Sequence, residues 1–415
     1  MKNMFKKLGL ILASALILAS MFGGMAFAEG DKGYSIEEIY RNGYSVSIHE
    51  KMIDHFPVVI VMTEYGPKEV IQYPDEYAGA YIDNNHNLNI LLVKGMDHSY
   101  DYRALTGYDE SVRFLDADFS YNQLCNVQSS FESVMLKYDI ESVGLNEIDN
   151  ALDVCLRSDL VKQEILNYLG NNIDNFSSNI IIFKESRGLH FTASNTSSNA
   201  LAGSVASYTS GGYIYSATLG FNAYNSSGQY GVVTAAHFAT SGTSIKNASG
   251  TTIGSASVRQ YSGTIDAAFI PFPSGISPSY KFCYPNPCDN FDVIHDSCTP
   301  LLGMLTCKIG GNTGLTWGTV LATSVNVSVK DEVTGIITTF TDQIRISNTQ
   351  LKGDSGGPVF NSYIVYEYGG FVATCQRIMG IATFADGSNY GYVSKIGNIC
   401  SILSVSLYYS PTLLG

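Results

Sequence analysis

The stretch Gly353-Asp354-Ser355-Gly356-Gly357-Pro358 decides which fold and which chemistry the rest of the chain has to support. A serine hydroxyl is a weak nucleophile until a base removes its proton, and its attack on a carbonyl needs donors for the oxyanion that forms. Glycines around Ser355 allow a tight bend, in which the N–H groups of Gly353 and Ser355 can form an oxyanion hole. A plain glycine-rich turn would explain a bare Gly-x-Ser-x-Gly pattern, but it does not explain this longer string.

A base for Ser355 has to come from elsewhere, and residues 201–415 contain two histidines, His237 and His295. His237 directly follows the apolar, strand-like run Gly231–Ala236, whose alanines let an imidazole pack close to neighbouring backbone. His295 has the pattern of a solvated residue in a polar loop, with three acidic residues near it: Asp289, Asp292 and Asp296. We therefore predict that His237 is the general base.

A carboxylate must then orient His237 and stabilise its protonated form. Asp266 is the best candidate, because the segment Thr264–Ile270 places apolar residues on both sides of it and predicts that it is buried. A buried carboxylate needs hydrogen-bond partners, which a histidine and backbone N–H groups would supply. Asp289 and Asp292 are the alternatives, but their polar, cysteine-rich surroundings predict that they are exposed.

The order His–Asp–Ser along the chain is that of the chymotrypsin type, and differs from the orders in subtilisin and in α/β-hydrolases. With it, residues 201–415 resemble the bacterial chymotrypsin-like proteases of the streptogrisin and α-lytic protease kind. The similarity rests on four further stretches: Leu201-Ala202-Gly203, Thr218–Asn222, Cys307-Lys308 and Thr313–Val320. It implies an all-β, double β-barrel fold with the catalytic triad between the barrels. It also implies a secreted serine endopeptidase that forms an acyl-enzyme and needs no cofactor.

The sequence departs from the family pattern where the family has cysteines. Phe238 follows the candidate base, and Trp317 stands where a cysteine usually pairs with the equivalent of Cys307. A further cysteine is missing from the stretch Thr349–Lys352, just before the nucleophile. These changes remove no catalytic group, but they leave the pairing of the eight cysteines open.

The resemblance also assigns residues that support the site. Thr383, Phe384 and Ala385 should form one wall of the pocket for the substrate residue before the scissile bond, with Thr349 near its base. No carboxylate occupies that base, so a preference for small or apolar residues is expected rather than one for Lys or Arg. Asp386 is expected on the rim.

Lys308 should reach Asp354, because bacterial members of the family place a basic residue directly after the cysteine of this motif. A carboxylate beside an oxyanion hole is expected to be partly buried and needs a cation or donors. We predict an ion pair that holds the Gly353–Ser355 loop in its active shape, although most single lysines are simply solvated.

The chain divides into two blocks. Residues 201–415 contain many short, strand-like runs between turn residues, followed by a helical pattern in Ile396–Leu403. Residues 29–186 contain a capping box at Ser35, a helical spacing over Tyr121–Tyr138, and a strand–helix–strand pattern near their end, which together predict a small α/β domain. The polar segment 187–200 joins the blocks. The resemblance implies that residues 29–186 are a pro-domain of a zymogen, which assists folding and is removed by cleavage in this linker.

Residues 1–28 have the pattern of a signal peptide: basic Lys2, Lys6 and Lys7, a short apolar run, and the small-x-small sequence Ala26-Phe27-Ala28. The run is short for a membrane anchor. Export would permit disulfides among the eight cysteines, and neither CxxC pairs nor histidine clusters indicate a metal site.

Composition limits the function further. A hydrophobic content of 45% with 15% charged residues favours packed domains, and a net charge of −13 argues against nucleic acid or anionic membranes as partners. The expected partners are protein or peptide substrates and the chain's own pro-domain. Two other functions remain open: a non-catalytic binding protein on a protease scaffold, and an esterase-type acyl transferase with the same triad.

Overall fold

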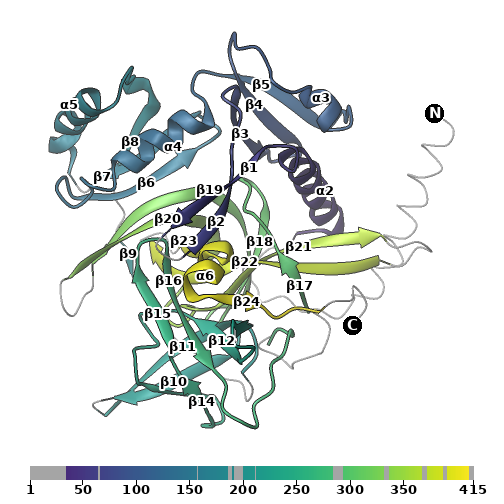
Figure 1. The fold of residues 1–415 in the computed structure, drawn as a ribbon, viewed down its shortest axis with the longest axis vertical. Coiled ribbons are helices and arrows are strands. Elements are labelled where there is room, and N and C mark those ends of the chain that lie inside the picture. Colours follow the sequence, from purple (N-terminus) through teal and green to yellow (C-terminus); the bar gives the residue numbers. More distant parts are fainter. Residues whose placement is uncertain are drawn as a thin grey trace.

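The computed structural model describes residues 34–410, apart from residues 64–65, 157, 186–188, 191–199, 211, 284–292, 331–335, 367–371 and 387–389. The predicted signal peptide, most of the linker, and the alternative acids Asp289 and Asp292 lie outside the described residues. Figure 1 shows most of the N-terminal elements at the top, one barrel at the bottom and the second barrel between them. None of the described helices is long and apolar enough to cross a membrane.

The first barrel is a curled antiparallel sheet with the strand order β14-β13-β10-β11-β12-β16-β15, and β24 pairs with β11. The strands are β10 (Val205–Ser210), β11 (Tyr213–Asn225), β12 (Tyr230–Thr234), β13 (Ser244–Asn247), β14 (Thr252–Ser255), β15 (Val258–Ser262), β16 (Ile265–Pro271) and β24 (Val405–Leu407). The sheet closes on itself, because a Cβ on Gly254 of β14 would lie 2.9 Å from the Ile270 side chain of β16. Its interior is filled by apolar side chains such as Leu219, Val232 and Ile245.

The second barrel is a closed ring in which β18, β21, β22, β23, β20 and β19 pair in that order and β19 pairs back with β18. Its strands are β18 (Leu305–Gly310), β19 (Gly314–Lys330), β20 (Ile337–Thr349), β21 (Pro358–Tyr366), β22 (Val372–Asp386) and β23 (Tyr390–Lys395), with β17 (Ile294–Ser297) beside β22. The helix α6 (Ile396–Leu403) buries Ile399 and Leu403 in a core that both barrels share. The predicted double barrel and C-terminal helix are therefore confirmed.

The N-terminal part mixes helices with two small sheets. Its elements are α2 (Ile36–Ile53), β1 (Val58–Thr63), β2 (Gly66–Ile71), β3 (Tyr77–Ile82), β4 (Leu88–Val93), α3 (Tyr102–Leu105), β5 (Val112–Ala117), α4 (Tyr121–Ser130), β6 (Ile140–Asn146), β7 (Ala151–Leu156), α5 (Lys162–Asn172), β8 (Ile181–Glu185), β9 (Leu189–His190) and 3₁₀ turns at Asp159–Val161 and Ser178–Ile180. The predicted capping box is present, since Ser35 and Glu38 bond reciprocally at the start of α2. The predicted strand–helix–strand unit is β7–α5–β8, whose strands are parallel.

One helix is shorter than its apolar spacing predicts. The pattern over Tyr121–Tyr138 predicts a single helix, but α4 ends at Ser130. Hydrogen-bonded turns then carry Phe131, Met135 and Tyr138 into the same core. Burial of these side chains therefore follows the spacing even where the helix does not.

The N-terminal part continues the sheet of the second barrel. Strand β6 pairs antiparallel with β19, with Val143 opposite Asn326. Helix α2 lies against β21, and Asn42 on it donates to the Gly303 carbonyl at 3.0 Å and accepts from the Leu305 N–H at 2.9 Å. The two parts also share one hydrophobic core, so this contact is extensive rather than a loose docking of separate units.

Glu147 is buried in this contact and is only half satisfied. Its Oε1 accepts from the Thr323 hydroxyl of β19 at 2.8 Å, and its Oε2 has no hydrogen-bond partner among the described residues. Burial raises the pKa of the Glu147 carboxyl, against the opposing effects of the Thr323 hydrogen bond and the Lys395 charge. An acid whose pKa is raised by folding destabilises the fold as pH rises above its ordinary value near 4, because the folded state must then bury the charge.

We therefore expect Glu147→Gln to raise the melting temperature of the full chain at pH 7 by about 1 °C for each kcal/mol gained, since the entropy of unfolding grows with chain length. At pH 4 the gain should nearly vanish, because the carboxyl is then largely protonated in both states. Thermal melts of Glu147→Gln and of the exposed control Glu164→Gln at both pH values test this. A lower melting temperature for Glu147→Gln at pH 7 would contradict it.

Candidate active site

His237 and Asp266 form a direct pair on the first barrel. His237 follows β12, and its Nδ1 lies 2.5 Å from Oδ2 of Asp266 on β16. The backbone N–H of His237 also donates to Oδ1 of Asp266 at 3.0 Å. The Asp266 side chain is fully buried, whereas that of His237 is 19% exposed. The carboxylate therefore fixes the imidazole at two points, while the ring keeps access to solvent.

The second barrel supports Asp266 from the other side. The backbone N–H of Asp266 donates to Oγ of Ser394 on β23 at 2.9 Å, and Ser394 donates to Oε1 of Gln343 on β20 at 3.0 Å. Both supporting side chains are fully buried. Neither residue could be predicted to support Asp266, since nothing in the local sequence links them to it. This chain of hydrogen bonds anchors the acid at the junction of the barrels.

Ser355 lies at the same junction. Its Oγ donates to the Thr383 carbonyl at 2.9 Å, and its own carbonyl accepts from the Thr218 N–H at 2.9 Å. The turn that follows it is pressed against the strand leading to His237, because a Cβ on Gly356 would lie 2.9 Å from the Ala235 nitrogen. The fold thus brings the three residues of the predicted triad to one interface.

The backbone around Ser355 has the shape that its glycines allow. Gly353 and Gly356 have φ values of 100° and 89°, which residues with a Cβ rarely adopt. The Thr218 hydroxyl donates to the Gly353 carbonyl and so holds the turn from the first barrel. Among the described residues, the N–H groups of Gly353 and Ser355 have no acceptor. They are therefore available to bind an oxyanion.

The predicted ion pair between Lys308 and Asp354 is present and fully buried. Lys308 Nζ lies 2.9 Å from Asp354 Oδ2, which also accepts from the Leu351 N–H and the Thr313 hydroxyl, each at 2.9 Å. Burial alone would raise the pKa of Asp354, but the Lys308 charge and these donors hold it below its usual value. A Cβ on Gly310 would collide with the Asp354 carboxylate, so this strand is shaped around the pair.

Loss of the cation should damage the site. Lys308→Met leaves Asp354 buried without its counter-charge, a change that typically costs 3–5 kcal/mol, and the loop carrying Ser355 depends on that carboxylate. We expect a lower melting temperature and at least about a tenfold loss of kcat/KM toward peptides, with Lys308→Arg milder. The exposed Lys246→Met is the matched control for both measurements. Unchanged activity in Lys308→Met would show that the pair does not hold the loop.

The candidate substrate wall is only partly as predicted. Thr383, Phe384 and Ala385 on β22 are buried beside Ser355, but Thr349 is exposed at the end of β20. A bulge shifts the pairing of β20 with β23 between Ile346 and Thr349. The buried side chain is therefore that of the next residue, Gln350.

Asp386 and His295 also differ from the predictions. The Asp386 side chain is only 3% exposed, so it does not lie on a rim. Its Oδ2 lies 2.5 Å from Nη2 of Arg345, which compensates the buried charge. His295 lies in strand β17 instead of a polar loop, and its Nδ1 accepts from the Gln376 N–H at 3.2 Å. Both residues are therefore part of the packed second barrel.

The cysteines that the structure describes form no disulfide: Cys125, Cys155, Cys283, Cys298, Cys307, Cys375 and Cys400. Cys307 lies directly opposite Trp317 in the β18–β19 ladder, and both side chains pack into the core shared by the barrels. The indole thus fills the position where the family pattern has a second cysteine. Phe238 likewise packs into the first-barrel core.

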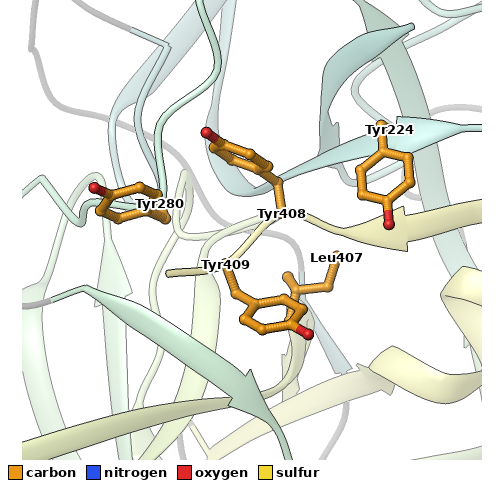
Figure 2. A pocket seen from close by; sticks show the side chains of 5 residues that line it. All are labelled: Tyr224, Tyr280, Leu407, Tyr408 and Tyr409. Carbon is orange, nitrogen blue, oxygen red and sulfur yellow. The ribbon is translucent and has the colours of Figure 1, made fainter. Parts of the chain in front are cut away.

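A separate pocket of about 360 Å³ lies on the first barrel and is lined by Tyr224, Tyr280, Leu407, Tyr408 and Tyr409 (Figure 2). Tyr224 lies six residues beyond Thr218, roughly 20 Å further along β11, so this pocket is remote from Ser355. No group of His, Cys, Asp and Glu within the described part of the chain could hold a metal ion.

Two barrels with a histidine, an aspartate and a serine at their junction define the chymotrypsin-like serine protease fold.

No family model matches the sequence, and no curated protein matches it. Solved structures that are similar to the chain include several bacterial proteases. Thermobifida fusca protease A matches with 20% identity and a TM-score of 0.40 over 51% of this chain and 100% of its own. Nocardiopsis protease matches with 22% identity and a TM-score of 0.40 over 50% of this chain and 98% of its own. Cellulomonas bogoriensis chymotrypsin matches with 18% identity and a TM-score of 0.40 over 51% and 100%.

Proposed function

We propose that this chain is a secreted serine endopeptidase. The observation that carries the proposal is the His237–Asp266 pair at the barrel junction, with the loop that presents Ser355 packed against the strand before His237. A histidine that is oriented by a buried acid can take the proton of a nearby serine and so activate its hydroxyl for acyl transfer. The acid is buried and bonded at both oxygens, which is what its orienting role requires.

The proposed reaction follows from these contacts. Asp266 holds Nδ1–H of His237, so Nε2 is the nitrogen that takes the proton of Ser355 as Oγ attacks the substrate carbonyl. The N–H groups of Gly353 and Ser355 stabilise the resulting oxyanion. Protonated His237 then gives its proton to the leaving amine, which breaks the peptide bond and leaves an ester on Ser355. Water, activated by His237 in the same way, hydrolyses that ester.

A covalent phosphonate that reacts with activated serines tests this function. Labelling of Ser355 in the exported protein, found by mass spectrometry, would support an enzyme, whereas absence of label would favour the non-catalytic binding protein. A peptide library would then separate a peptidase from an esterase, because only the peptidase cleaves amide bonds in it.

We also infer that residues 29–186 act as a pro-domain. Strand β6 extends the sheet of the second barrel at β19, and a double barrel with many non-local contacts is slow to fold alone. A preformed strand could therefore template β19. Residues 201–415 should refold poorly by themselves and recover activity when residues 29–186 are added, and efficient unaided refolding would exclude this role.

The position of β9 supports cleavage of the linker by the chain's own active site. Leu189 and His190 pair antiparallel with Asp386 and Ala385, at the end of the wall that starts beside Ser355. An extended segment on this strand edge has the geometry of a bound peptide. Removal of a signal peptide at residues 1–28 completes the proposed maturation.

A further inference from the structure

Gln350 is buried next to the candidate site with its polar atoms unsatisfied. Its side chain is 0% exposed, and neither Oε1 nor Nε2 has a hydrogen-bond partner among the described residues. A buried amide without hydrogen bonds is costly, and most buried polar groups have a partner. An unsatisfied amide at such a place indicates that its partner comes from a ligand.

The backbone fixes where this amide lies. On one side of Gln350, Thr349 pairs with Tyr390 of β23, and on the other the Leu351 N–H donates to Asp354 Oδ2 at 2.9 Å. The amide oxygen lies over Gly391, because a Cβ at that position would collide with it. Gly391 in turn pairs with Ala385 of β22. The amide therefore sits between the loop of the nucleophile and the substrate wall.

This place is close to the reacting groups, and the neighbouring strand β22 pairs there with an extended segment of the chain. Thr383 lies two residues before Ala385 on β22, and its backbone carbonyl accepts a hydrogen bond from the Ser355 hydroxyl at 2.9 Å. Strand β9 pairs with β22 at Ala385 itself. A peptide bound along this edge would place a side chain between the wall and Gln350, just before the bond that Ser355 attacks.

Two acids near this place are each paired with a basic residue. Asp386 is paired with Arg345 and also accepts from the Tyr390 N–H at 3.2 Å. Asp354 is paired with Lys308. Asp354 and Asp386 therefore already have basic partners, so neither these acids nor Lys308 and Arg345 are free counter-charges for a substrate side chain.

We propose, on the basis of the proposed peptidase function, that Gln350 determines specificity by binding a polar, uncharged side chain on the residue before the scissile bond. Glutamine and asparagine match it best, because a carboxamide offers a donor to Oε1 and an acceptor to Nε2 at once. This differs from the preference for small or apolar residues that the sequence predicts. A site built around a hydrogen bond rejects analogues that lack it strongly, since its own polar group is then left unpaired.

The test uses peptides that differ only in the residue before the scissile bond, carrying Gln, Asn, Met, Leu, Glu or Lys there. The wild-type enzyme should cleave the Gln and Asn peptides at least about tenfold better in kcat/KM than the Met and Leu peptides. Gln350→Met, of nearly the same size, should reverse this ratio, and the exposed Gln229→Met should leave it unchanged. Gly391→Ala should weaken the preference by displacing the amide.

The ratio between two substrates does not depend on how much of a variant folds, so a poorly stable variant still reports. A wild-type preference for Met, Leu, Glu or Lys overturns the role of Gln350 even if Gln350→Met cannot be purified. Cleavage with such a preference, together with phosphonate labelling of Ser355, leaves the peptidase function intact. A protein that neither takes the label nor cleaves any peptide refutes the function and the specificity together.

Discussion

Ser355→Ala should abolish peptidase activity and leave the fold in place, with turnover reduced by about 10⁴ to 10⁶. Within the described part of the chain, the hydroxyl makes one hydrogen bond, to the Thr383 carbonyl, so its removal leaves a small cavity and few unpaired groups. The backbone contacts of the loop do not involve Oγ: the Thr218 N–H still donates to the carbonyl of residue 355. What is lost is the nucleophile itself.

The measurements are kcat on a cleaved peptide, phosphonate labelling, and a thermal melt. Ser227→Ala, which alters an exposed serine in a turn of the first barrel, is the matched control and should behave as the unaltered chain does. The Ser355→Ala precursor should also stay uncut between residues 187 and 200 if the chain cleaves itself. Cleavage at the normal place in this variant would assign processing to another protease, and retained peptidase activity would refute the nucleophile.

Residues that act within a short stretch of sequence could be predicted well. The loop of Ser355 follows from its own glycines, and the position of His237 follows from the strand before it. The ion pair of Lys308 with Asp354 is present. It could be predicted from the resemblance because both residues belong to motifs on which the resemblance rests. The burial of Asp266 was predicted from its apolar neighbours, and it has 0% exposure.

Residues that meet only through the folded barrels could not be predicted. Ser394 is 128 positions from Asp266, and its hydroxyl is polar like many others in the sequence. Gln350 was missed because a bulge in β20 shifts the side-chain alternation by one residue, and such shifts leave no composition signal. The pairing of β6 with β19 could not be predicted for a different reason, since the sequence of either strand would allow it to pair elsewhere.

Asp266→Asn should reduce turnover by about 10⁴ while the fold persists. The two oxygens of Asp266 have different tasks: Oδ1 accepts from the His237 backbone N–H, and Oδ2 faces its ring Nδ1. An asparagine has a single acceptor oxygen, which the fixed backbone N–H claims. Its NH₂ group then faces Nδ1 and donates to it, so Nδ1 must be the unprotonated nitrogen. Nε2 then carries the proton and cannot accept one from Ser355.

We expect Asp266→Asn to lower kcat with little change in KM or melting temperature, because the amide nearly matches the carboxylate in size. The ring nitrogens of His237 should show the exchanged tautomer by NMR, a change that a merely structural defect would not produce. Asp292→Asn is the comparison, since Asp292 is the alternative acid from the sequence. If Asp266→Asn turned over normally and Asp292→Asn did not, the orienting acid would be Asp292, and the short contact between Asp266 and His237 would be only structural.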